Sequence, residues 1–233
     1  MKSSGMENKA HARTLVITIL QCLIGTVAVW ALLSLIAWSL GYWQAWAFAP
    51  VFVIPMILSG YYYALKEPEL LERRKVKWKS FTTRQKKYMA YTYTVELCLF
   101  VFPAVDHRFG WSHLPEAVSI CGLVLILAAN VIWIVSKREN PFAGAGITVY
   151  EGHRLIKTGP YAVLRHPNYA ADTLWVLGIP LALGSWWGLL LVLLLVPAQV
   201  TMIFDEERFL AKNLPGYTDY LKEVRFRLIP RIW

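Results

Sequence analysis

The sequence predicts an all-α, polytopic integral membrane protein with about five to six transmembrane helices. Its 233 residues are 57% apolar and only 17% charged, whereas a soluble domain is usually about one quarter charged. The stretch 14–65 contains no Asp, Glu, Lys, Arg or His, and its 52 residues suffice for two crossings of about 20 residues each. The Lys and Arg residues gather between the apolar runs. These observations exclude a soluble globular protein.

The first two helices are expected in that uncharged stretch. We expect one over 14–40 and a second over 45–65, joined by a turn at 41–44 with aromatic interface anchors. Pro50 and Pro55 are expected to kink the second helix. The first run is too long for a signal-peptide core and lacks a small-residue cleavage site, so we expect it to remain as an anchor.

Four further helices are expected over 88–105, 114–136, 169–183 and 187–204. The last two are short for full crossings and only a brief turn separates them. They therefore predict a C-terminal helical hairpin that is tight, tilted or partly re-entrant.

The tail after the hairpin is expected to contain one more short helix. Tyr217, Leu221 and Val224 fall on one helical face, with charged residues elsewhere. This pattern predicts an interfacial amphipathic helix, which Pro230 ends.

The polar segments divide the chain into two expected regions. Residues 1–113 hold the first three helices and a basic loop at 66–87. Residues 114–233 hold the other helices, a polar loop at 137–169 and a tail at 205–233. A short hairpin brings its two ends together, so we expect the loop and the tail to form one site at the membrane surface.

Loop charge predicts the orientation of the chain. Nine Lys or Arg residues lie in 66–87, five in 137–165 and six after residue 204. With six crossings, these segments and the N-terminus fall on one side, which the positive-inside rule makes cytoplasmic. We expect both termini in the cytoplasm, at the inner or plasma membrane if the protein is bacterial. The basic residues do not alternate with aromatic ones along an exposed helix, so no nucleic-acid partner is expected.

The cysteines predict neither a disulfide framework nor a metal site. Cys22, Cys98 and Cys121 lie in separate apolar segments, without CxxC or Cys/His spacing. We expect them to be small core residues.

The segment 153–169 carries the first group of residues that suggests chemistry. Pro167 disfavours a helical conformation of His166, and Asn168 is a suitable N-cap for the following helix. The free amides of that helix start, together with Arg165 and His166, would bind an anion. A basic turn at the lipid headgroups, with His166 as a cap, would explain the same residues.

The second group is the acidic run Asp205, Glu206 and Glu207, at the expected end of the sixth helix. Acids at a helix C-terminus oppose the helix dipole, so a cationic partner would explain their presence. Solvation and pairing with Arg208 or Lys212 is the alternative. Adjacent helical residues do not share a face, so at most two of the three acids point into one site.

Glu96 is the third candidate, near the middle of the third helix. An ionisable residue at that depth should face the bundle interior or a polar cavity. A packing pair with one of the tyrosines or with Asn130 is the alternative.

Together these segments resemble the isoprenylcysteine carboxyl methyltransferase family, a group that includes related bacterial membrane methyltransferases and phospholipid N-methyltransferases. The run HRLIKTGPYAVLRHPNY, the pair Glu206–Glu207 and the run GYTDYLKEVRFRLIP carry the resemblance, which covers about 115–233. It implies an S-adenosyl-L-methionine site between the last helices, open to the cytosol. Residues 114–233 would then be the methyltransferase core.

Position by position, the resemblance implies a set of cofactor-contacting residues: His153, Arg154, Leu155, Ile156, Tyr161, His166, Pro167, Asn168, Tyr169 and Glu206. Their chemistry suits the cofactor. Glu206 can receive its ammonium, and the basic helix start can receive its carboxylate. Tyr161 or Tyr169 can face the sulfonium, and Leu155 and Ile156 can cover the adenine.

The catalytic candidates are Arg165, Glu207 and Glu96. Arg165 could orient an anionic acceptor, and Glu207 or Glu96 could act as the base that a neutral amine or thiol would need. The prenylcysteine enzymes carry a substrate-assigned Arg one helical turn before the first acid of the pair. Met202 occupies that position here. The part of the expected site that would bind the methyl acceptor therefore departs from the family pattern.

The predicted function is methyl transfer from S-adenosylmethionine to a lipophilic acceptor at the cytoplasmic membrane face. Isoprenylcysteine carboxyl O-methylation is the first candidate, and the acceptor would be a membrane-embedded small molecule, a prenylated group or a membrane lipid. Phospholipid N-methylation and small-thiol S-methylation are alternatives. An NADPH-dependent sterol-type membrane reductase, with a similar Arg-His-Pro-Asn-Tyr segment, and a non-enzymatic membrane scaffold are the others.

Overall fold

The computed structural model describes residues 2–66, 81–142, 147, 149 and 152–233. Within these ranges the protein is all-helical, without a strand, which confirms the predicted fold class. The helices are α1 (Lys2–Ala37), α2 (Trp43–Lys66), α4 (Thr83–Phe109), α5 (Glu116–Glu139), the short 3₁₀ helix η2 (Gly159–Ala162), α6 (Pro167–Ala182), α7 (Gly188–Asn213) and α8 (Tyr217–Glu223).

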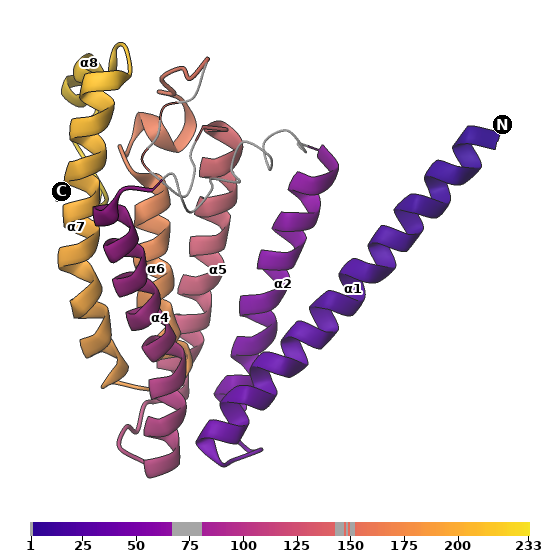
Figure 1. Ribbon diagram of the computed structural model, residues 1–233. Helices are drawn as coiled ribbons and strands as arrows, with labels where there is room; N and C mark the ends of the chain where they lie inside the picture. The colour runs from indigo at the N-terminus through magenta and orange to yellow at the C-terminus, as the bar shows by residue number, and fades with distance from the viewer. Residues whose placement is uncertain (1, 67–80, 143–146, 148, 150–151) are drawn as a thin grey trace.

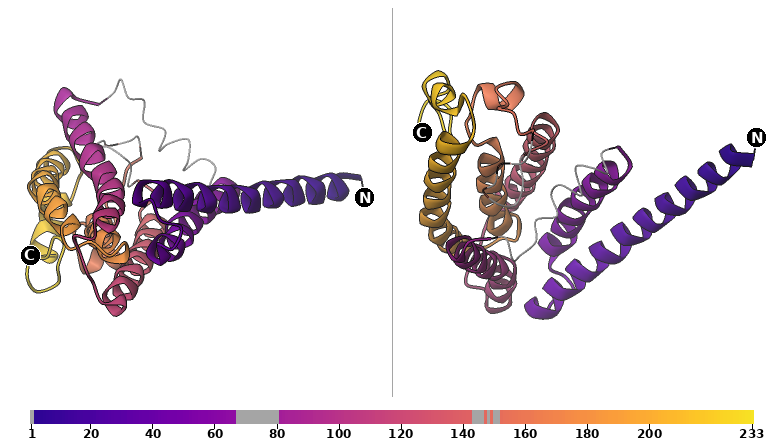
Figure 2. Two further views of the ribbon diagram at one scale, coloured as in Figure 1. Left: turned by 90° about the horizontal axis from the view of Figure 1, so that it is seen from below. Right: turned by 45° about the horizontal axis from the view of Figure 1, so that its top comes forward.

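The four helices α4 to α7 form one bundle, and α2 packs against its α5 side (Figure 1). Helix α1 meets α2 near their shared turn and leans away from the bundle toward its N-terminus, as Figure 2 also shows. Five helices among the described residues are long and apolar enough to cross a membrane, namely α1, α2, α4, α5 and α7. The chain is a multi-pass membrane protein.

Helix α6 is the short arm of the predicted hairpin. Its 16 residues give a length of about 24 Å, below the roughly 30 Å of a bilayer core. It packs most extensively against α5, where glycines replace side chains. A Cβ added at Gly122 would lie 2.2 Å from the backbone nitrogen of Ala182, and one at Gly178 would lie 2.9 Å from the Gly122 carbonyl oxygen. The two backbones therefore touch only because both positions are glycine.

Several helix ends differ from the predicted ones. Helix α4 begins five residues earlier than expected, because Thr82 and Gln85 form a capping box. The N-cap of α6 is His166, with Pro167 at the first helical position, so the prediction of Asn168 as N-cap was wrong. Helix α7 continues to Asn213, which places the three acids inside it and removes the argument from the helix C-terminus.

The turns at the lower end of the bundle are joined by buried polar contacts. Asp106 is fully buried and accepts hydrogen bonds from the backbone and hydroxyl of Ser112, at 2.7 and 2.6 Å, and from the hydroxyl of Ser185. The Tyr42 hydroxyl donates to the carbonyl of Leu183. These contacts connect the α1–α2, α4–α5 and α6–α7 turns.

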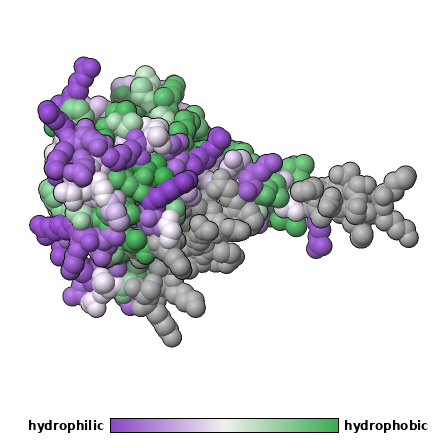
Figure 3. All heavy atoms as spheres, turned by 90° about the horizontal axis from the view of Figure 1, so that it is seen from above, coloured by the Kyte–Doolittle hydropathy of each residue, from purple (hydrophilic) through white to green (hydrophobic). Residues whose placement is uncertain are grey.

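The described helix ends that flank the basic segments lie toward the opposite end of the bundle. Figure 1 shows the end of α2, the start of α4, the end of α5 and helix α8 at the top. Seen from that side, hydrophilic side chains dominate the bundle end, with apolar ones between them (Figure 3). The predicted basic loop 66–87 lies largely outside the described residues. Helix α8 buries Tyr217 and Tyr220 against Leu155 and Leu210, so its apolar face covers the bundle.

The prediction that the cysteines are core residues was wrong for two of them. Cys98 and Cys121 are exposed on the helix surfaces, while Cys22 is half-buried. A small apolar side chain suits a lipid-facing helix surface as well as a core, and the sequence pattern does not distinguish these environments.

Candidate functional site

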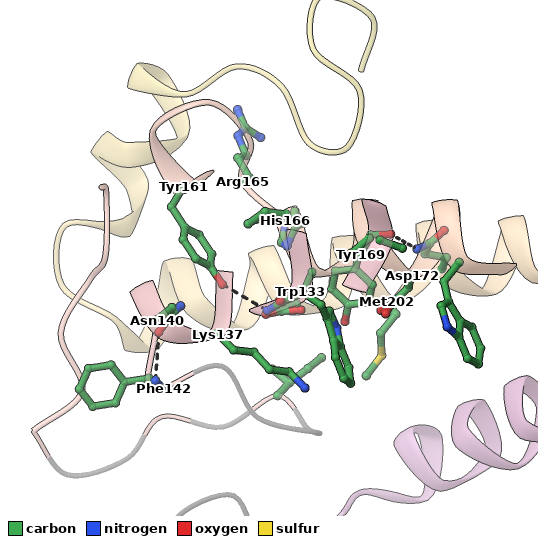
Figure 4. A pocket seen from close by; sticks show the side chains of 18 of the residues that line it. Trp133, Lys137, Asn140, Phe142, Tyr161, Arg165, His166, Tyr169, Asp172 and Met202 are labelled. Carbon is green, nitrogen blue, oxygen red and sulfur yellow. Dashed lines mark hydrogen bonds between the residues drawn. The ribbon is translucent and has the colours of Figure 1, made fainter. Parts of the chain in front are cut away.

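A cavity of about 680 Å³ lies in the upper half of the bundle, within the range of small-molecule sites. Helices α4, α5, α6 and α7 form its walls, and the segment before α6 and helix α8 contribute the residues nearest the bundle end (Figure 4). Because α2 and α4 also contribute lining residues, the pocket crosses the predicted division at 113/114, which remains a prediction.

The start of α6 forms the polar end of this pocket. The Asn168 amide donates to the Tyr161 hydroxyl at 3.2 Å, and the Tyr220 hydroxyl donates to the Tyr161 carbonyl at 2.7 Å. Two buried atoms of pocket-lining residues, the side-chain oxygen of Asn168 and the hydroxyl of Tyr217, have no hydrogen-bond partner among the residues described. Buried polar groups of this kind are normally satisfied by a ligand or by water.

The acidic run separates into three environments. Asp205 pairs with Arg84 at 2.9 Å near the surface. Glu206 lines the pocket, where it interacts with the hydroxyl of Tyr169. Glu207 is 6% exposed and lies outside the lining. The sequence left open which of the last two acids faces the site, and the structure places Glu206 there.

Glu207 is the centre of a buried ion cluster. Its carboxylate accepts hydrogen bonds from Arg165 at 3.1 Å and from Arg227 at 3.0 to 3.1 Å, and it lies 3.3 Å from the His166 ring nitrogen. The cluster joins the loop before α6, helix α7 and the C-terminal tail. A carboxylate held by these partners has a bracing role in the fold, and its predicted role as a base stays a prediction.

Arg165 belongs to the same brace. The residue lines the pocket, but its guanidinium donates to the carbonyls of Val224 and Leu221 as well as to Glu207. These donors fix the loop to the C-terminal end of α8. The Arg165 guanidinium already donates to three acceptors within the protein. Its role in orienting an anionic methyl acceptor stays a prediction.

The segment 153–156 forms one stretch of the pocket wall. His153, Leu155 and Ile156 line the cavity, whereas Arg154 is exposed and lies outside the lining. The His153 ring stacks on Phe142 with centroids 4.4 Å apart, and burial lowers the pKa of this imidazole below its ordinary value.

The remaining predicted cofactor residues, Tyr161, His166, Pro167, Asn168 and Tyr169, all line the pocket. The structure thus brings together nine of the ten predicted cofactor positions, all except Arg154.

The deeper region of the pocket contains charged groups that the sequence reasoning missed, together with the predicted Glu96. Asp172 lines it from α6, and Lys137 lines it from α5 with its ammonium over the Trp133 ring. Asp172 is the one ionisable side chain in the apolar stretch 170–183, so the argument applied to Glu96 could have found it. Across the described residues, no three His, Cys, Asp or Glu side chains gather in a metal-binding group.

Comparison with known proteins relates this site to a family. Residues 117–215 match the model of a family described as phospholipid methyltransferase. This segment contains nearly all of α5, all of α6 and α7, and the connections between these three helices. Comparison with curated proteins gives no significant match.

Among solved structures, the chain is similar to the eukaryotic intramembrane Ras methyltransferase ICMT (isoprenylcysteine carboxyl methyltransferase). The sequences are 19% identical, the match covers 97% of this chain and 90% of that chain, and the TM-score is 0.47. The family match makes the chain similar to the phospholipid methyltransferases over the residues that build most of the pocket.

Proposed function

We propose that the protein transfers a methyl group from S-adenosylmethionine to a lipophilic acceptor, at the cytoplasmic face of the membrane. The observation that carries the proposal is that the three neighbouring acids, Asp205, Glu206 and Glu207, lie in different environments. Asp205 and Glu207 have cationic protein partners, whereas Glu206 faces a pocket that also contains two buried polar atoms without a partner among the described residues.

The residues present fit this methyl donor. Glu206 would bind its ammonium, and the first-turn amides of α6, which lack a helical acceptor, would bind its carboxylate. Leu155 and Ile156 offer apolar surface to the adenine, and Tyr169 offers a ring face to the sulfonium. The donor supplies a methyl group that is electrophilic because it is bonded to a positively charged sulfur.

The protein then has to orient the reactants and exclude water. Tyr217 and Tyr220 of α8 contribute to the pocket at the bundle end, and the Tyr220 hydroxyl fixes this helix to η2. Glu207 and Arg165 hold the tail against the loop before α6. These residues would therefore act by holding the cofactor loop in place.

The acceptor needs a separate argument. The resemblance implies a carboxyl group, but Met202 is buried in the pocket wall at the position where those enzymes carry a substrate-assigned Arg. An isoprenylcysteine carboxyl group, a lipid amine and a small thiol are the candidate acceptor classes. The reductase and scaffold alternatives have no observation in their favour within the described site.

The first test is calorimetric titration of the detergent-purified protein with S-adenosylhomocysteine, S-adenosylmethionine and NADPH. We expect the two adenosyl ligands to bind and NADPH not to bind. Glu206→Gln should weaken their binding about tenfold to a hundredfold, because a charge-assisted hydrogen bond is lost. Asp205→Asn, one residue away on the Arg84 side, is the matched control and should bind as the parent does. Binding of NADPH alone would contradict the proposal.

A further inference from the structure

We infer that Gln199 is a positioning residue for the methyl donor. Its side chain fixes α7 against the start of α6, so that Glu206 and the first-turn amides of α6 are held at the separation that the donor requires. The inference rests on the proposed function, because it takes the pocket as the site of the methyl donor. Gln199 lies outside the sequence motifs that point to that donor.

Gln199 connects α7 to α6 through both polar atoms of its amide. The two helices run side by side from the turn that joins them (Figure 1). The amide nitrogen donates to the Tyr169 carbonyl at 2.8 Å, and the amide oxygen accepts from the Thr173 hydroxyl at 3.0 Å. The same hydroxyl lies 2.8 Å from the Tyr169 carbonyl oxygen. These three groups form a closed hydrogen-bonded ring, and the Gln199 side chain cannot turn away without breaking two of its bonds.

Gln199 lies on the same face of α7 as the pocket residues that follow it. Met202 comes three residues later and Glu206 seven residues later, and all three side chains line the cavity. Residues at these spacings share one helical face. The rotation of α7 that Gln199 fixes is therefore the rotation that directs the Glu206 carboxylate into the pocket.

A proline makes this part of α7 dependent on contacts with its neighbours. Pro197, two residues before Gln199, lacks the N–H of a helical hydrogen bond, and its ring disfavours a straight helix. The segment that carries Glu206 therefore follows a weakened turn. The Tyr91 hydroxyl of α4 holds this turn from one side by donating to the Leu194 carbonyl at 2.8 Å, and Gln199 holds it from the α6 side.

The chemistry of the methyl donor explains why this placement matters. The ammonium and the carboxylate of S-adenosylmethionine are bonded to the same carbon atom, so the groups that bind them must keep a constant separation. In the proposed site Glu206 of α7 binds the ammonium, and the first-turn amides of α6, the turn that contains Tyr169, bind the carboxylate. Gln199 joins these two binding groups and so preorganises the site.

The test is a double-mutant cycle with S-adenosylhomocysteine as the probe. Calorimetry measures its affinity for the full chain in nanodiscs, as the parent, as Gln199→Leu, as Glu206→Gln and as the double variant. We expect Gln199→Leu to weaken binding about tenfold in the parent but less than about threefold in the Glu206→Gln protein. The second loss is smaller because the placement of α7 matters little once its ammonium-binding group is neutral.

Thr201→Val is the matched control. The Thr201 hydroxyl donates to the Pro197 carbonyl within α7 at 2.7 Å, and the residue is exposed, so this variant should bind the probe as the parent does. Thr173→Val is a second variant, which keeps Gln199 and removes the hydroxyl that holds it. It should weaken binding about threefold, and it decides the question if Gln199→Leu does not fold.

Two results overturn the inference. One is a Gln199→Leu or Thr173→Val protein that binds like the control. The other is an equal loss from Gln199→Leu with and without the Glu206 carboxylate, which would give Gln199 a general role in packing. If the parent binds S-adenosylhomocysteine in a Glu206-dependent way while Gln199→Leu has no effect, the proposed function stands and the inference fails. If the parent does not bind it, both fail.

Discussion

At the scale of single residues, two neighbouring glutamates have different environments because helical residues one apart point about 100° away from each other. Glu206 faces the pocket, and Glu207 faces two arginines and a histidine. A change at either position should therefore affect a different property of the protein.

Glu207→Ala should destabilise the fold. It leaves the Arg165 and Arg227 guanidinium groups without their carboxylate, and breaking a buried pair typically costs about 3–5 kcal/mol. The midpoint of thermal unfolding in detergent should fall clearly. Glu223→Ala, which removes an exposed pair with Lys157, should lower the midpoint by far less. Equal shifts for the two variants would show that the cluster does not brace the fold.

The pH response of His153 follows from its burial. Because its folded-state pKa lies below 6.5, the unfolded chain binds a proton that the folded chain does not, between the two pKa values. Stability should therefore fall as the pH drops below about 6.5 and should be unaffected by this group above that pH. An NMR titration of the ring should give a pKa below 6.5, and Phe142→Ala should move it back upward. A pKa of 6.5 or higher in the parent protein would refute this.

At the scale of helices, the close α5–α6 contact depends on glycine, which has no side chain, at positions 122 and 178. This closeness matters for the site, because α5 carries Trp133 and Lys137 and α6 carries Asp172.

Gly122→Ala should lower stability and the yield of folded protein. Its new methyl group would lie 2.2 Å from a backbone nitrogen of α6, which the helices can relieve only by moving apart. Gly60→Ala in α2 is the matched control, because no atom lies within 4 Å of its added Cβ. The control should be neutral or more stable by up to about 1 kcal/mol. Thermal unfolding of both variants, with the parent alongside, measures the difference.

The helices were largely predictable from apolar runs, but their ends were not. Apolar length located each of the six predicted segments. The start of α4 follows from the local capping box of Thr82 and Gln85, which lies outside the apolar run that predicts the helix. The extension of α7 beyond Phe204 was missed because its last turns are charged, and their helicity depends on partners such as Arg84 and Arg227 that are distant in sequence.

At the scale of the molecule, the basic segments in the described ranges gather at one end, together with the candidate site. The motif residues around Asn168 and Glu206 were predictable because their order is family-specific. Asp172 stands alone as an ionisable residue in an apolar stretch and was predictable in the same way as Glu96, whereas Lys137 was not, since only packing shows that it and Asp172 line one cavity.

The cytoplasmic orientation can be tested with single cysteines in a background without the native ones. A cysteine at position 113, in the α4–α5 turn, should react with a membrane-impermeant thiol reagent added outside intact cells. A cysteine at position 219, in α8, should react only after the cells are opened. The reverse pattern would invert the proposed topology.

The polar contacts of the lower turns have a mechanical consequence. Asp106 and Tyr42 join three turns at one end of the bundle, whereas the pocket lies toward the other end. The helices are therefore fixed to one another at the lower end, which acts as a hinge, and can separate more easily at the end that holds the pocket. In a 24-residue helix about 36 Å long, a tilt of about 5° at the hinge moves the far end by about 3 Å. A lipophilic molecule sliding between the helices would meet the least resistance beside the pocket and the most at the hinge.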